Sequence, residues 1–210
     1  MLLCALAAKG YALAEPEGVV ELNRVLFRRL VETRNSYQPW LVAFTRNGSK
    51  KCEKCTPLLE EVASRSYGYL FIGKVDQDQE PLLAHDYEVV KNWTVFVFDQ
   101  DGHHKLDFPC DAHRYYRELL SALPNDVLDA DPTWVESSKK KPSAILFTSR
   151  FKIPPMWRAI AGYFKDKGLR VGLITEQEYF GAFGVTHVPQ VLYLNASGKY
   201  PVQNVPDYKT

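Results

Sequence analysis

Short apolar runs alternate with amphipathic stretches over the first half of the chain. Continuous apolar runs, such as the one at 40–44, are typical of strands buried on both faces of a sheet. Apolar side chains recur at helical spacing over 23–33, and Asn23 stands where a helix N-cap is expected. Asp101-Gly102 lies between two apolar runs and predicts a hairpin turn. The predicted strands are 19–22, 40–44, 69–75, 94–98 and 105–108, and the predicted helices are 23–33, the stretch after Cys55, 81–87 and 115–123.

The predicted order is therefore β-α-β-α-β-α-β-β-α. Parallel strands need helical crossovers and the hairpin adds antiparallel strands, so we expect one mixed sheet between helices. A second, similar series follows, in which Pro154-Pro155 opens a helix and 176–183 forms a short one. It ends without a closing helix, so we expect the second domain to be incomplete at its C-terminus. The predicted strands of this series are 144–147, 171–174 and 190–194.

Changes in composition divide the chain into segments. Residues 125–141 are rich in Pro, Asp, Ser and Lys and predict a linker. One domain is then expected at 15–124 and the other at 142–210. Before them, residues 1–14 are small and apolar and end in Ala12-Leu13-Ala14, which is typical of a secretory signal peptide; the alternative is the start of an amphipathic helix.

Composition and charge exclude several classes of function. Hydrophobic residues make up 46% of the 210 residues and charged residues 24%, which allows a packed core. The net charge of +1 argues against a nucleic-acid-binding protein, which needs a concentrated basic surface. No apolar run approaches about 18 residues, so no membrane span is predicted. Three Asn-x-Ser/Thr sequons, at Asn47, Asn92 and Asn195, favour the secretory pathway and predict glycosylation sites.

Cys52-Glu53-Lys54-Cys55 is the sharpest chemical feature, because it stands between a buried strand and an amphipathic helix. At a helix N-terminus the backbone N–H groups and the helix dipole favour a thiolate. This position favours a redox pair, with Cys52 as nucleophile and Cys55 as resolving cysteine. Half a zinc site completed by His103-His104, and an inert structural disulfide, are the alternatives. Cys110 is left over, either as a small core or strand-end residue or as the site of an intermolecular disulfide.

These motifs resemble those of the protein disulfide isomerase family. In the first half the likeness lies in Val19–Leu22, the buried strand through Phe44, the Cys52–Cys55 pair and the 94–98 strand with its Asp101-Gly102 turn. In the second half it lies in 146–149 and 183–189, which are similar to a redox-inactive thioredoxin-like domain. The resemblance implies an α/β fold of two tandem thioredoxin-like domains, in which only the first carries a CxxC pair.

Several positions depart from the pattern of the family's active members. The family usually has Trp shortly before the first cysteine, where Lys50 and Lys51 stand here. The buried acid that assists the resolving cysteine in the family would fall at Ala43, which cannot titrate. Active members have a cis-proline before the penultimate strand, and here the matching residue is Trp93. A cis bond before a non-proline residue costs about 3 kcal/mol, so Asn92–Trp93 is expected to be trans. Pro189 keeps the proline in the second half, where there is no cysteine pair.

Two functions follow from this sequence. The first is a thiol–disulfide oxidoreductase or isomerase that acts on protein disulfides during folding in the endoplasmic reticulum lumen or the wider secretory pathway. The second is a redox-inactive thioredoxin-like chaperone or scaffold module of a larger protein. Unfolded or disulfide-bonded client proteins are the expected partners, further domains of a longer protein are a second possibility, and neither a cofactor nor a metal is expected.

Overall fold

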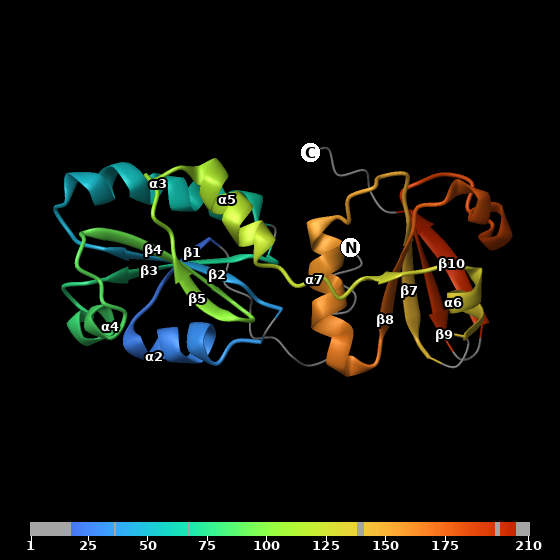
Figure 1. Ribbon diagram of the computed structural model, residues 1–210, viewed down its shortest axis with the longest axis horizontal. Coiled ribbons are helices and arrows are strands. Elements are labelled where there is room, and N and C mark those ends of the chain that lie inside the picture. The colour runs from blue at the N-terminus through green and yellow to red at the C-terminus, as the bar shows by residue number, and fades with distance from the viewer. Residues whose placement is uncertain (1–17, 36, 67, 138–140, 196–197, 205–210) are drawn as a thin grey trace. The chain divides into compact units, whose positions relative to one another are not determined.

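The computed structural model describes residues 18–35, 37–66, 68–137, 141–195 and 198–204. The chain divides into two compact units, Met1–Ala122 and Leu123–Thr210, each built on its own five-stranded sheet (Figure 1). The α/β class and the two mixed sheets predicted from the sequence are confirmed. The expected signal peptide at 1–14, the last six residues of the chain and part of the Asn195 sequon lie outside the described residues.

The first unit has the strand order β1-β3-β2-β4-β5. Strands β1, β3 and β2 are parallel, β4 runs antiparallel to β2, and β5 runs antiparallel to β4 and so in the direction of the first three. Helices α3 and α5 cover one face of the sheet, and α2 and α4 cover the other (Figure 1). The elements are β1 (Val19–Glu21), α2 (Arg24–Phe27), the π-helix η1 (Arg28–Glu32), β2 (Trp40–Thr45), α3 (Lys50–Arg65), β3 (Phe71–Asp76), α4 (Pro81–Asp86), β4 (Trp93–Asp99), β5 (Gly102–Lys105) and α5 (Ala112–Ser121).

Local signals explain where several of these elements begin and turn. The Asn23 side chain accepts a hydrogen bond from the backbone N–H of Leu26 at 2.8 Å, which is the predicted N-cap. Gly102 has φ +129°, a conformation that favours glycine, and directly follows the turn between β4 and β5. The second hairpin strand is 102–105 rather than the predicted 105–108. Phe27 and Phe44 belong to a buried cluster between α2, α4 and the sheet, so the predicted apolar stripes meet in one core.

The second unit has the strand order β10-β9-β7-β8-β6, in which β6, β7 and β8 are parallel, β9 runs antiparallel to β7, and β10 runs antiparallel to β9. Successive residues of β7 face opposite sides of the sheet. Ala144 and Leu146 pack with α7, whereas Ile145 and Phe147 pack with α6. The elements are β6 (Leu128–Asp129), α6 (Pro132–Ser137), β7 (Ser143–Phe147), α7 (Pro155–Phe164), the 3₁₀ helix η2 (Lys165–Lys167), β8 (Arg170–Ile174), the 3₁₀ helices η3 (Gln177–Tyr179) and η4 (Gly181–Phe183), β9 (Gln190–Asn195) and β10 (Gly198–Asn204).

The prediction of a linker at 125–141 is wrong over much of that segment. Leu128 and Asp129 pair with β8 as an edge strand, and residues 132–137 form helix α6. Ala130 and Val135 are buried in the core of the second unit. Only a few apolar residues in this polar segment are buried, so the sequence shows too little hydrophobic periodicity to reveal the strand and the helix.

Among the described residues, no helix has both the length and the apolar character needed to span a bilayer.

Candidate functional site: three cysteines around the start of α3

Helix α3 places both cysteines of the CxxC motif in its first two turns. The helix begins at Lys50, directly after the loop that follows the buried strand β2, so the predicted β–α junction is present. Cys52 is the third residue of the helix and Cys55 the sixth. Residues three apart on a helix are neighbours on its surface, with Cβ atoms about 5–6 Å apart. The helix therefore holds the two cysteines side by side.

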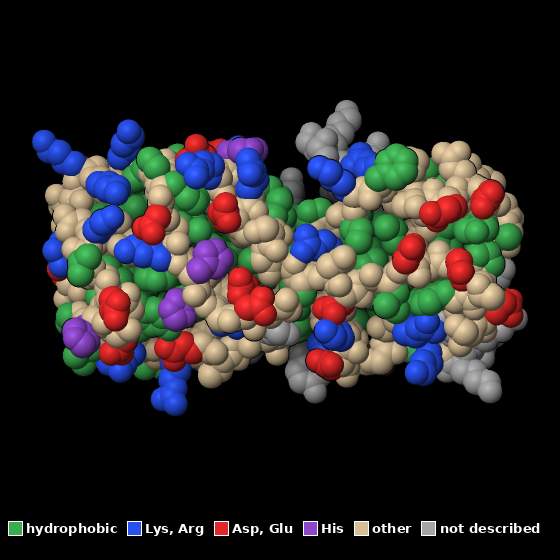
Figure 2. Space-filling view, in the orientation of Figure 1, with side chains coloured by type: hydrophobic (Ala, Val, Ile, Leu, Met, Phe, Trp, Pro, Cys, Tyr) green, Lys and Arg blue, Asp and Glu red, His purple; other side chains and the backbone are tan. Residues whose placement is uncertain are grey.

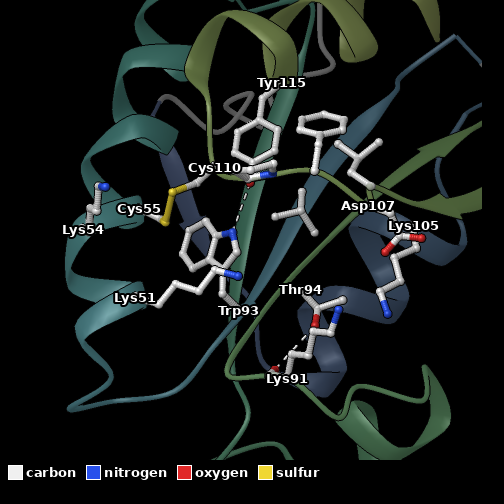
Figure 3. A pocket seen from close by; sticks show the side chains of 14 residues that line it. Lys51, Lys54, Cys55, Lys91, Trp93, Thr94, Lys105, Asp107, Cys110 and Tyr115 are labelled. Atoms are coloured by element: carbon white, nitrogen blue, oxygen red, sulfur yellow. Dashed lines mark hydrogen bonds between the residues drawn. A yellow bond between two sulfur atoms is a disulfide. The ribbon is translucent and has the colours of Figure 1, made fainter.

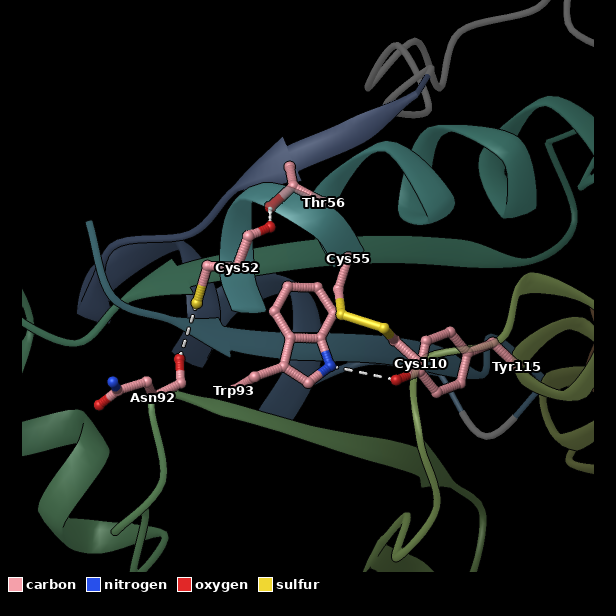
Figure 4. The surroundings of a disulfide bond; sticks show 7 residues. All are labelled: Cys52, Cys55, Thr56, Asn92, Trp93, Cys110 and Tyr115. Atoms are coloured by element: carbon pink, nitrogen blue, oxygen red, sulfur yellow. Dashed lines mark hydrogen bonds between the residues drawn. A yellow bond between two sulfur atoms is a disulfide. The ribbon is translucent and has the colours of Figure 1, made fainter. Parts of the chain in front are cut away.

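The structure pairs Cys55 with Cys110, which lies in the loop between β5 and α5. The two Cα atoms are 5.8 Å apart, and the bond joins residues 55 positions apart in the chain. Figure 4 shows this disulfide connecting the start of α3 to that loop. Cys110 was expected to be a core or strand-end residue, or to pair with another molecule, and both interpretations are corrected. The physical reason is that the sheet brings the β5–α5 loop next to α3, which spacing along the chain does not show.

Cys52 is a free thiol, and it is only 6% exposed. Its sulfur donates a hydrogen bond to the backbone carbonyl of Asn92 at 2.9 Å (Figure 4). The same sulfur accepts a hydrogen bond from the backbone N–H of Arg46 at 3.3 Å. Gln77 also donates to the Asn92 carbonyl, at 3.2 Å. These contacts hold the thiol beneath the loop that precedes β4.

Trp93 is the first residue of β4 and lies beside the disulfide. Val188–Pro189 is the one cis peptide among the described residues, so the bond between Asn92 and Trp93 is trans, as expected. The indole is 4% exposed, and its Nε1–H donates to the Tyr115 hydroxyl at 3.1 Å (Figure 4). Burial raises the pKa of Tyr115 above its ordinary value, while the bond from Trp93 acts in the opposite direction. The bulky residue at the family's proline position is thus fixed against the oxidised cysteines.

The position of the missing buried acid is apolar in the structure as well. Ala43 is fully buried in the middle of β2, and its neighbour across the sheet is Lys74 on β3. The Lys74 ammonium group forms an ion pair with Glu21 at 2.7 Å. Because the side chain of Ala43 is a methyl group, this position under α3 has no group that could exchange a proton with Cys55.

A hollow of about 480 Å³ opens over the disulfide (Figure 3). Its lining includes Cys55, Cys110, Trp93, Tyr115 and apolar residues of β4 and of the loop after β5. Lysine and arginine side chains gather on the face of the first unit where α3 begins (Figure 2). Four lysines line the hollow, and one carboxylate, that of Asp107, lies among them. None of the four makes an ion pair with a residue that the structure describes. The four lysines are Lys51, Lys54, Lys91 and Lys105.

The second unit keeps the proline but has no cysteine. Its cis bond, Val188–Pro189, lies directly before β9. The four cysteines of the sequence all precede this unit. The two elements of a family active site therefore stand in different units, as the sequence indicates.

The sequence left a zinc site as an alternative. In the part of the chain that the structure describes, no three His, Cys, Asp or Glu side chains come together to bind a metal ion. The ring of His103 instead contacts the aromatic rings of Tyr87 and Phe98.

Among the sequon residues, Asn47 and Asn92 are both exposed. The Asn47 amide donates to Asp76 at 2.6 Å, and the Asn92 side chain accepts from Arg46 at 3.2 Å.

Solved structures confirm that both units have thioredoxin folds. The full-length crystal structure of ERdj5 matches 98% of this chain with a TM-score of 0.54 at 19% identity, and its form II matches 98% with a TM-score of 0.59 at 19% identity. This chain spans 32% and 29% of those chains, respectively. No protein-family model matches the sequence.

Curated relatives give the likeness at the level of sequence. A protein disulfide isomerase-like 2-3 protein of Oryza sativa subsp. japonica is 33% identical over 41% of this chain. A bifunctional thioredoxin reductase/thioredoxin of Mycobacterium leprae is 34% identical over 30% of it. This chain spans only 19% and 14% of the lengths of these relatives. The resemblance to the protein disulfide isomerase family, based on the CxxC motif and the two domains, is confirmed.

Proposed function

We propose that the first unit is a thiol–disulfide exchange module that acts on protein disulfides, with Cys52 as nucleophile. Cys55, once an external thiol such as glutathione has reduced its bond to Cys110, is the cysteine that resolves the mixed disulfide. The observation that carries this proposal is a free thiol one helical turn from a cysteine held in a disulfide. Thiol–disulfide exchange needs these two partners within reach of each other, and α3 supplies both.

The surroundings of the disulfide suit a polypeptide client. The hollow has an apolar floor that includes Trp93 and Phe108, and Cys55 and Cys110 line the same space. An apolar side chain of an unfolded client would be removed from water there, next to the Cys55–Cys110 disulfide. The names of the curated relatives, a disulfide isomerase-like protein and a thioredoxin fusion, favour the same class of reaction.

We place this activity in the endoplasmic reticulum lumen or elsewhere in the secretory pathway. Support comes from the small apolar segment at 1–14, from the sequons at Asn47 and Asn92, and from a disulfide that an oxidising compartment maintains. Glycosylation at Asn92 would place a glycan next to the loop that covers Cys52, because the Asn92 carbonyl accepts the Cys52 thiol hydrogen.

The decisive experiment measures insulin reduction and the refolding of a scrambled disulfide protein by wild type and Cys52→Ser. We expect the substitution to abolish turnover, since serine keeps the size of the side chain but cannot form a disulfide. Ser64→Ala, on an exposed position of the same helix, is the matched control and should keep wild-type turnover. Equal turnover by wild type and Cys52→Ser would reject the proposal.

A redox-inactive chaperone or scaffold module is the second candidate. The burial of Cys52, the alanine at position 43 and Trp93 at the proline position favour it. Prevention of aggregation of a denatured client is then the measurement, and Cys52→Ser should leave it unchanged because the Cys55–Cys110 crosslink is kept. Loss of holding activity together with loss of insulin turnover in that variant would count against this candidate.

A further inference from the structure

The three cysteines of the first unit differ in exposure in a way that the CxxC motif alone does not predict. Cys52, the expected client-facing residue, is 6% exposed and Cys55 is fully buried. Cys110 is partly exposed and lines the hollow, which Cys52 does not. The sulfur best placed to meet a client therefore belongs to the third cysteine.

The order of the sulfurs suits an internal exchange. In Figure 4, Cys55 lies between Cys52 and Cys110, and its disulfide points away from Cys52. Exchange proceeds by attack of a thiolate on one sulfur and departure of the other. When Cys52 attacks the sulfur of Cys55, the Cys55–Cys110 bond breaks and Cys110, on the far side of Cys55, is the leaving group.

We propose that Cys52, Cys55 and Cys110 form an internal disulfide relay in which Cys52 displaces Cys110 from Cys55, and that the released Cys110 thiol is the cysteine that attacks client disulfides. This inference rests on the proposed exchange of client disulfides at this site, but it reassigns the attack on the client from Cys52 to Cys110. In the relay, the first bond that Cys52 attacks is the Cys55–Cys110 disulfide of its own chain.

Each step of the relay balances. The Cys52 thiol gives up its proton to solvent, the Cys52–Cys55 bond forms, and the Cys55–Cys110 bond breaks. Cys110 leaves as a thiolate and can take up a proton. One disulfide and one thiol are present before and after, so the rearrangement needs no oxidant or reductant.

The released Cys110 then supports isomerisation of a client. Its thiolate attacks a client disulfide, forming a mixed disulfide and freeing one client thiol. Another client thiol attacks the client sulfur of the mixed disulfide, which forms a new client disulfide and returns Cys110 as a thiolate. The client gains and loses no electrons overall, while Cys52 and Cys55 stay joined.

The test maps the free thiols of the full chain, carrying Cys4→Ser in all samples, after purification in its oxidised form without reductant. The protein is incubated with a maleimide at mildly alkaline pH, digested with trypsin and analysed without reduction. Cleavage after Lys54 separates Cys52 from Cys55, so each disulfide has its own mass. We expect peptides with a Cys52–Cys55 bond and labelled Cys110, with several-fold more Cys110 label than in Cys52→Ser. Equal Cys110 labelling in the two proteins would overturn the relay.

Two further arms separate the relay from other routes. Leu59→Ala weakens the buried core behind α3. Faster Cys110 labelling in that variant would show that Cys52 attacks the Cys55–Cys110 bond in unfolded molecules and not in the native fold, and would overturn the proposal. Oxidised glutathione, used as a small disulfide client, should form its adduct on Cys110, and an adduct on Cys52 would overturn the client-facing assignment. If Cys52→Ser loses insulin turnover but Cys110 is never labelled, the proposed function stands and the relay fails.

Discussion

Removal of the Cys55–Cys110 crosslink by Cys110→Ser should destabilise the first unit by an amount set mainly by the length of the closed loop. The bond joins residues 55 positions apart. In the chain-entropy model, a loop of that length lowers the entropy of the unfolded chain by about 14 cal/mol/K, which is about 4 kcal/mol at 25 °C. A change of that size is a large fraction of the stability of a typical domain.

Urea unfolding followed by circular dichroism and tryptophan fluorescence measures this loss. With a slope of about 2 kcal/mol/M, the midpoint for the first unit should fall by about 2 M. The crosslink lies wholly within Met1–Ala122, so a separate transition of the second unit serves as an internal reference. Reduced wild type should match Cys110→Ser, and Cys52→Ser should keep the oxidised midpoint.

Identical midpoints for oxidised and reduced wild type would refute this reasoning. That result would mean that the crosslink does not constrain the unfolded chain. A loss in Cys110→Ser that reduction of wild type does not reproduce would instead point to the side chain at position 110 and not to the bond.

Three further outcomes are expected. Charge reversal by Lys91→Glu with Lys105→Glu should weaken binding of an acidic disulfide peptide about tenfold at low salt and less at high salt, as measured by fluorescence anisotropy. Salt-independent binding would contradict a role for the lysines that line the hollow. Tyr115→Phe should cost about 1–3 kcal/mol in urea unfolding, because the buried Trp93 N–H loses its acceptor, and an unchanged midpoint would argue against that bond. A hydrogen bond from a backbone N–H of α6 lowers the pKa of Asp131, so its stabilising contribution is present above its ordinary pKa and lost as pH falls through the lowered value. Wild type should accordingly lose more stability than Asp131→Asn between about pH 5 and about pH 3 in acid unfolding, and parallel curves would contradict this.

Most elements of the first unit could be predicted from local pattern. The Asn23 cap, the turn at Asp101-Gly102 and the buried run of β2 each depend on residues close together in the sequence. Sequence reasoning also placed the CxxC motif at the start of a helix. It missed β6 and α6, because Ala130 and Val135 are too few to show a period within a polar segment.

The partners within the site could not be predicted in the same way. The bond from Trp93 to Tyr115 and the thiol hydrogen bond from Cys52 to the Asn92 carbonyl join residues 22 and 40 positions apart. Cys110 did carry one signal, since it remained unpaired once the CxxC motif was assigned. Nothing in its neighbours along the chain identified its partner.

By itself, the sequence determined the alternation of strands and helices, the two-domain plan and the position of two thiols at a helix N-terminus, since these follow from periodicity, caps and spacing. Only the tertiary structure decided that Cys55 joins Cys110 and that Cys52 stays a buried thiol. The physical reason is that a disulfide forms between the sulfurs that the fold brings within bonding distance, and the packing of a distant loop against α3 sets that distance.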